Sequence, residues 1–116
     1  INPLLVDEQI RGGVVQGLGP AFFEECLYDE TGQMINASLA DYLVPMAGEM
    51  PDIEIAHIET PTRDTILGAK GVGEAGTAAA GAAAMNAVND ALRPTGARIY
   101  QTPMTPQRIL TALGHV

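Results

Sequence analysis

The first pattern along the chain is a helical repeat of apolar side chains near its start. These side chains follow one another mostly at three- or four-residue intervals: Ile10, Val14, Leu18, Ala21 and Phe22. The spacing predicts an amphipathic helix over residues 8–28. Glycines interrupt it at Gly12, Gly13, Gly17 and Gly19, and each interior glycine costs a helix about 1 kcal/mol relative to alanine. Such a helix is expected only where neighbours stabilise it, or where something approaches its backbone closely.

A second pattern, in which side chains alternate between two faces of an extended segment, marks the candidate strands. Residues 52–59 read DIEIAHIE, with Ile53 and Ile55 on one face and Ala56 and Ile58 on the other. Two apolar faces predict a strand that is buried on both sides. Shorter strands are expected at residues 33–36 and 97–101, and short turns at residues 29–32 and 38–42.

The alanine-rich run over residues 75–92 predicts a second helix, which packs through small side chains and ends before a breaker cluster at residues 93–96. Thr105 and Pro106 form an N-cap and first-turn pair, and Gly114 marks the end of a third helix. Together these elements predict an α+β fold in which glycine- and alanine-rich helices pack on a small mixed sheet. Residues 1–116 are expected to form one structural unit.

Size and composition change this picture in one respect. The chain has 116 residues and is 47% hydrophobic, but much of that fraction is alanine and only five residues are aromatic. Small side chains bury little area, so we expect part of the surface to be covered by something else, including a second copy of the chain. The first residue is Ile1 rather than methionine, which suggests a processed, trimmed or fragmentary sequence.

Charge and cysteine content exclude several classes of function. A formal net charge of −8 with scattered basic residues argues against nucleic-acid binding. The single cysteine, Cys26, excludes an internal disulfide and fits a reducing compartment such as the cytoplasm. No apolar run is long enough to span a membrane. His57 and His115 have no partner ligands at useful spacing, so no metal site is predicted within the chain.

The stretch GAKGVGEAGT, residues 68–77, carries the candidate chemistry. Gly71, Gly73 and Gly76 match the G-x-G-x-x-G pattern of dinucleotide-binding folds, but no acidic residue follows the next predicted strand. The carboxylate of Glu74 would also repel a pyrophosphate at the start of the helix. Two interpretations of Glu74 therefore stay open: a carboxylate that favours the helix dipole, or a catalytic carboxylate on a glycine loop.

Four blocks of sequence resemble one family in collinear order. They are INP..VDEQIRGGVVQGLGPAFFEE, DETGQMINASLADYLVP, GAKGVGEAGTAAAGAAAMNAVNDAL and TPMTPQRILTAL. Together they resemble the C-terminal part of the molybdenum-cofactor-binding large subunit of the molybdenum hydroxylases, the xanthine oxidase, aldehyde oxidase and carbon monoxide dehydrogenase family. The carbon monoxide dehydrogenase-like large chains look most similar.

The resemblance implies roles for particular residues. It implies that Glu74 is the general base beside the molybdenum, since a positioned carboxylate can take a proton in a partly buried pocket. It implies that Lys70, Gly71, Val72 and Gly73 face the pterin, and that Gln16 reaches the cofactor pocket. Close approach of the cofactor would then account for the glycines of the first helix. A solvent-facing Gln16 and a plain surface Lys70 remain the alternatives.

The resemblance also implies the wider setting. It implies a molybdenum–molybdopterin cofactor in its cytosine dinucleotide form, the remainder of the large subunit, and iron–sulfur and flavin subunits or domains that carry electrons onward. By itself the chain would supply a base and part of a pocket wall, and is expected to be inactive. The alternative is a stand-alone remnant that acts as an assembly or oligomerisation module. The substrate and the presence of copper cannot be determined from these residues.

Overall fold

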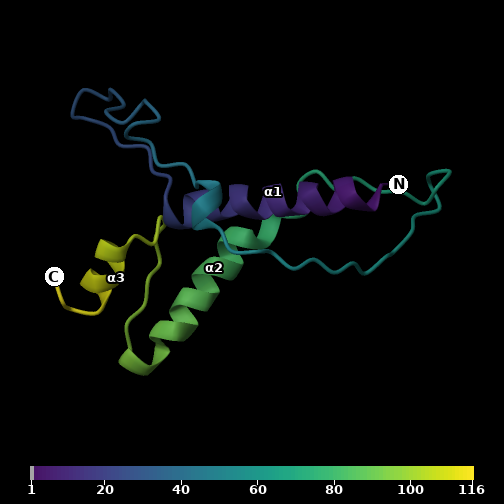
Figure 1. Ribbon diagram of the computed structural model, residues 1–116. Coiled ribbons are helices and arrows are strands. Elements are labelled where there is room, and N and C mark those ends of the chain that lie inside the picture. Colours follow the sequence, from purple (N-terminus) through teal and green to yellow (C-terminus); the bar gives the residue numbers. More distant parts are fainter. Residues whose placement is uncertain (1) are drawn as a thin grey trace.

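The computed structural model describes residues 2–116, which form helices joined by long irregular segments (Figure 1). The α-helices are α1 (Pro3–Phe22), α2 (Thr77–Leu92) and α3 (Pro106–Ala112), and the short 3-10 helices are η1 (Ala47–Glu49) and η2 (Arg93–Thr95). Among the described residues no strand forms, and one isolated antiparallel bridge joins Tyr28 to Met34. The predicted α+β fold with a small mixed sheet is therefore wrong, because the described chain is helical.

The three predicted strands fail because their backbone pairing is either absent or too short. Residues 33–36 pair with the segment after α1 over one bridge, in which the Gln33 carbonyl accepts from the Asp29 amide and the Ile35 amide donates to the Leu27 carbonyl, both at 2.9 Å, and the pairing extends no further. Ile99, in the predicted strand 97–101, bonds instead to the Asn89 side chain, with its N–H donating to Oδ1 and its carbonyl accepting from Nδ2, both at 2.9 Å. Residues 52–59 have no assigned secondary structure and no strand beside them. Alternation shows that a segment can enter a sheet, but a second strand must supply the hydrogen bonds.

The sequence predicted the centre of helix α1 correctly but placed both of its ends too late in the chain. It starts at Pro3 because the Asn2 side-chain oxygen accepts from the Leu5 amide at 3.3 Å and proline suits the first turn. It ends at Phe22, and the amides of the next two residues both donate to the Gly19 carbonyl, at 2.8 and 2.9 Å. Cys26, which falls inside the predicted helix of residues 8–28, is exposed beyond this end.

The two later helices match their predictions closely. Helix α2 covers Thr77–Leu92 within the predicted range 75–92. Helix α3 starts after Thr105, whose hydroxyl accepts from the Arg108 amide at 3.3 Å, and Pro106 occupies its first position. Residues 29–32 form the expected turn, closed by the Gly32 amide on the Asp29 carbonyl at 3.0 Å.

A small core lies where the end of α1, the length of α2 and the segment before α3 meet. Its buried side chains are Ala21, Ala84, Leu92, Ile99 and Met104. The Met104 amide donates to the Ala21 carbonyl at 2.6 Å. An ion pair between Arg108 and Glu25, at 2.5 Å, joins α3 to the segment after α1.

Away from this core the structure is open. The radius of gyration is 18.0 Å, whereas a compact domain of this length has about 13 Å. The accessible surface is 8744 Å², against about 6,000 Å² for a globular protein of this mass. In Figure 1 the segment between η1 and α2 runs beside α1, passes its N-terminal end and returns to α2. No helix in the described part of the chain combines the length and apolar character needed to cross a bilayer.

Candidate functional site

Helices α1 and α2 cross at glycines, and this crossing fixes the start of α2. A Cβ atom on Gly17 would lie 2.7 Å from the Ala80 Cβ, and one on Gly76 would lie 2.3 Å from the Ile10 carbonyl oxygen. The Thr77 hydroxyl donates to the carbonyl of Gly13 at 3.0 Å. We call this contact the helix crossing; its residues are Ile10, Gly13, Gly17, Gly76, Thr77 and Ala80.

The helix crossing corrects one expectation about α1. Cofactor approach was expected to explain the glycines of this helix, but the element that approaches Gly13 and Gly17 is α2. Gly19 faces the Glu24 side chain, and a Cβ atom there would lie 2.5 Å from its Oε1. Gly12 alone among these four has no neighbour within 4 Å of a built Cβ atom. The interior glycines of α1 are therefore mainly a requirement of packing within the chain.

The glycine loop, residues 68–74, leads directly into the helix crossing. The Glu74 carbonyl accepts from the amides of Thr77 and Ala78, both at 3.1 Å, so the backbone of Glu74 is tied to the first turn of α2. Its side chain is exposed, and its carboxylate makes no hydrogen bond or ion pair within residues 2–116. A fixed backbone with an unengaged carboxylate can present an acceptor to a group outside this chain.

A residue that the sequence did not single out holds the loop from the other side. The Gln9 side-chain amide on α1 donates to the Gly73 carbonyl at 2.9 Å. Gln9 lies seven residues before Gln16, which is two helical turns, so both project from the same side of α1. That spacing was the available signal for Gln9. Gln16 itself is exposed and makes no hydrogen bond within residues 2–116.

Two glycines of the loop have no explanation within the chain. Built Cβ atoms on Gly71 and Gly73 meet nothing within 4 Å, and neither residue has a positive φ. Gly68 differs, since its φ is +67° and a Cβ atom would lie 2.8 Å from the Pro61 Cβ. Side chains at positions 71 and 73 would therefore project into space that this chain leaves open.

The remaining residues of the predicted site lie in the same loop. Val72 is half-buried, and its carbonyl accepts from the Ala75 amide at 3.1 Å. Lys70 is exposed, and its ammonium group bonds the Thr60 hydroxyl. The structure thus places residues 70–74 together on one loop, while Gln16 stands on α1 without a hydrogen bond to that loop.

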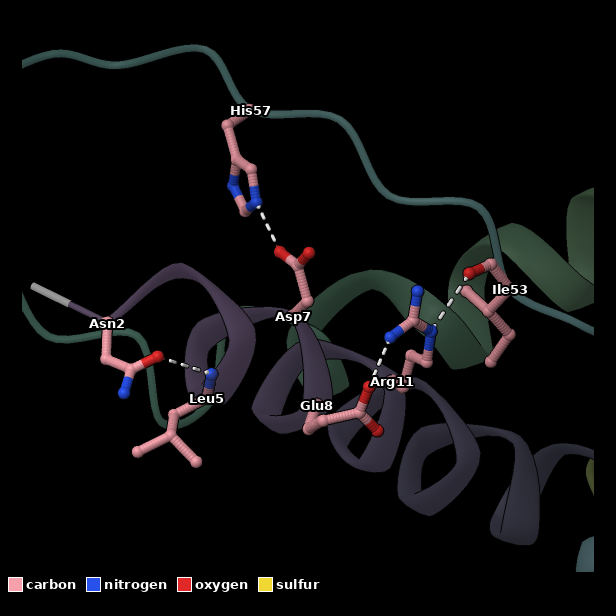
Figure 2. A network of polar contacts seen from close by, with 7 residues as sticks. All are labelled: Asn2, Leu5, Asp7, Glu8, Arg11, Ile53 and His57. Carbon is pink, nitrogen blue, oxygen red and sulfur yellow. Dashed lines mark hydrogen bonds and ion pairs between the residues drawn. The ribbon is translucent and has the colours of Figure 1, made fainter.

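A network of polar contacts holds the segment after η1 against the first half of α1 (Figure 2). His57 Nε2 lies 2.7 Å from Asp7 Oδ1, and Arg11 Nε donates to the Ile53 carbonyl at 3.3 Å. Arg11 also pairs with Glu8. His57 is thus tied to α1 by a carboxylate, and residues 2–116 contain no group of three or more His, Cys, Asp or Glu side chains placed to hold a metal ion.

Two ionisable groups with a shifted pKa lie between α1 and η1. The Thr31 hydroxyl, at 2.7 Å, and then the Gln33 amide lower the pKa of Asp29 below its usual value of 3.8. Loss of hydration raises the pKa of Tyr42, and the carboxylate of Glu24, to which the phenol donates at 3.3 Å, adds to the effect. Both contacts stabilise the irregular segment that follows α1.

Comparison with known proteins connects this geometry to a family. The model of the molybdopterin cofactor-binding domain matches residues 1–51. The nicotine 6-hydroxylase large subunit of Paenarthrobacter nicotinovorans is 49% identical over 112 residues, which cover 97% of this chain and 14% of that protein. The carbon monoxide dehydrogenase large chain of Afipia carboxidovorans is 36% identical over 109 residues, covering 94% of this chain and 14% of that protein.

Solved structures contain the same conformation. Quinoline 2-oxidoreductase from Pseudomonas putida 86 matches with a TM-score of 0.94 and 44% identity, covering 98% of this chain and 14% of that one. A Cu,Mo-CO dehydrogenase matches with a TM-score of 0.90 and 35% identity, covering 99% of this chain and 15% of that one. The open arrangement of residues 2–116 is thus found inside much longer chains. The chain belongs to the family of molybdopterin cofactor-binding large subunits of the molybdenum hydroxylases and dehydrogenases, and it corresponds to one segment of such a subunit.

Proposed function

We propose that this chain is the segment of a molybdenum-dependent oxidoreductase that supplies Glu74 as general base and the glycine loop as part of the cofactor pocket. The observation that carries the proposal is the pair Gly71 and Gly73. Neither a positive φ nor a contact within the chain accounts for these glycines. A group outside residues 2–116 that approaches the backbone closely would account for both.

The loop has the chemistry to hold the pterin of the cofactor. Exposed backbone amides without side-chain obstruction can donate hydrogen bonds to its polar atoms, and Lys70 adds a positive charge beside them. Val72 supplies an apolar contact, and Gln16 would extend the same wall from α1. When bound, the molybdenum cofactor, here proposed in its cytosine dinucleotide form, would supply the two-electron redox chemistry.

Glu74 has the properties that a general base requires. Its backbone is held at the start of α2, and Gln9 holds the preceding carbonyl, so the carboxylate projects from a fixed point. Because that carboxylate has no partner within residues 2–116, its oxygens remain available to accept a proton during the reaction. General bases of this kind contribute about 10²–10⁴-fold to rate.

For the substrate, we propose an aromatic nitrogen heterocycle. The relatives named for nicotine and quinoline share 49% and 44% identity with this chain, and the carbon monoxide dehydrogenase of Afipia carboxidovorans shares 36%. Hydroxylation replaces a ring C–H bond by C–OH with oxygen from water, and releases two electrons and two protons. Iron–sulfur and flavin partners in the cytoplasm would accept the electrons, and a homo-oligomer of the complex is proposed.

This chain spans 14% of the length of the curated relatives named above. On this proposal the isolated segment is inactive, because it provides only part of the pocket. The second candidate is a stand-alone assembly module, which the large exposed apolar surface favours. The two differ in the native polypeptide, which would be much longer and contain molybdenum in the first case only.

The decisive experiment uses the native polypeptide. Its intact mass and molybdenum content are measured first, and then turnover of nicotine, quinoline and carbon monoxide by the wild type, Glu74→Gln and the exposed control Glu30→Gln. We expect Glu74→Gln to lose about 10²–10⁴-fold in kcat while keeping its molybdenum, and Glu30→Gln to match the wild type. Full turnover by Glu74→Gln would refute the base, and a short, metal-free native chain would favour the assembly module.

A further inference from the structure

Residues 52–60 form a segment that lacks pairing with any other described backbone segment. Within residues 2–116, none of its N–H or C=O groups takes part in a backbone–backbone hydrogen bond. Its apolar side chains are unequal in burial, since Ile53 and Ile55 are half-buried while Ile58 is 95% exposed. A row of unpaired backbone groups beside exposed apolar side chains is the property of a strand edge that accepts another strand.

One edge of this segment already faces α1. The Ile53 carbonyl accepts a hydrogen bond from Arg11 Nε. His57, four residues after Ile53, is held by the Asp7 carboxylate (Figure 2). In an extended chain the N–H and C=O of one residue point to the same edge, and those of the next residue point to the opposite edge. Because Ile53 directs its carbonyl toward α1, the backbone groups of Glu54, Ala56 and Ile58 belong to the edge that faces away.

We propose that this free edge pairs with a β-strand supplied by the rest of the same large-subunit polypeptide. The occupant follows from the comparisons, since the same conformation is found with TM-scores of 0.94 and 0.90 in chains of which this segment makes up 14% and 15%. The exposed surface exceeds that of a globular protein of this mass by about 2,700 Å², so polypeptide outside residues 2–116 has much surface to cover.

The side chains indicate what the partner strand carries. Ile58 and Ala56 favour β-branched or aromatic residues opposite them. Glu54 favours a basic or amide side chain in the facing position, because a second carboxylate there would be destabilising.

Hydrogen–deuterium exchange on the full-length native large subunit tests the pairing. We expect the amides of Ala56 and Ile58 to exchange at least about a hundredfold more slowly than unprotected amides. We expect Ala56→Pro, which removes one donor, to lower the thermal midpoint and the yield of folded subunit. Ala56→Ser keeps the donor, and Glu30→Pro places proline in an exposed turn, so both should behave as the wild type. Fast exchange together with a neutral Ala56→Pro would overturn the proposal.

The oligomeric state of the large subunit distinguishes a partner strand from the same polypeptide from one supplied by another subunit. The exchange is repeated with the large subunit diluted until it is monomeric, as shown by its sedimentation, and free of other subunits. Protection that persists in the monomer supports a strand from the same polypeptide. Protection that appears only on self-association, or only after other subunits are added, would assign the edge to a different partner and overturn the proposal.

Discussion

The glycine loop leads directly into the α2 side of the helix crossing, and the two regions use glycine for different reasons. At the helix crossing, Gly17 and Gly76 lie so close to the opposite helix that a methyl group would overlap it. In the loop, a methyl group built on Gly71 or Gly73 would meet nothing within 4 Å. Contacts within the chain explain the first pair, whereas on our proposal a group outside the chain explains the second pair.

On this view the helix crossing stabilises the fold of the segment, and the glycine loop is proposed to contact groups outside it. Substitutions at the helix crossing should change stability, because they force two backbones apart. Substitutions at Gly71 and Gly73 should leave stability unchanged and alter cofactor binding. The following predictions, made for the full-length polypeptide, test this separation in order of decreasing effect.

The largest effect on stability is expected at position 76. A Cβ atom at Gly76 would lie 2.3 Å from the Ile10 carbonyl oxygen, so we expect Gly76→Ala to destabilise by about 1–3 kcal/mol, measured by thermal unfolding. The matched substitution Gly71→Ala should leave the thermal midpoint unchanged and reduce the molybdenum content. Equal effects of the two substitutions on stability would remove the distinction between the helix crossing and the loop.

A second prediction concerns the packed part of α2. The Asn89 side chain bonds both backbone groups of Ile99 and the Met85 carbonyl. Asn89→Ala leaves the buried Ile99 backbone without these partners, and we expect a loss of about 1–3 kcal/mol in unfolding free energy. Asn86→Ala, at an exposed position of the same helix, is the control. A loss no greater than that of the control would show that water replaces the Asn89 side chain.

The third prediction joins the two regions through Gln9. Its amide holds the Gly73 carbonyl next to Glu74, and a hydrogen bond of this kind contributes about 0.5–1.5 kcal/mol. We expect Gln9→Ala to lower kcat several-fold with little change in the thermal midpoint. Gln107→Ala on α3 serves as the control. An unchanged kcat would mean that the loop is positioned by the helix crossing alone.

The smallest effect is expected in acid at the turn of residues 29–32, where Gly32 has a φ of +82° and is explained locally. Hydrogen bonds from Thr31 and Gln33 lower the folded-state pKa of Asp29 below 3.8. The stabilising contribution is therefore complete above the unfolded pKa and is lost as pH falls through the lower folded pKa. Asp29→Asn should flatten the acid limb of the stability profile slightly, as followed by unfolding between pH 2 and 5. An identical profile would show that the turn contributes nothing.

The sequence by itself determined the features that depend on neighbouring residues. The Thr105–Pro106 pair and the alanine run located α3 and α2 because capping and helix propensity act within a few residues. The order of four sequence blocks identified the family, and the sequence also predicted that Glu74 lies just before the start of a helix.

The tertiary structure decided the features that depend on distant residues. The sequence could not show that Gly17 faces Ala80 or that Gln9 reaches Gly73, because those contacts join residues more than sixty positions apart. It also could not show that residues 52–59 lack a strand beside them within this chain. Alternation is a property of one segment, whereas a sheet requires the hydrogen-bonding groups of a second segment. Only the folded arrangement shows whether that second segment is present.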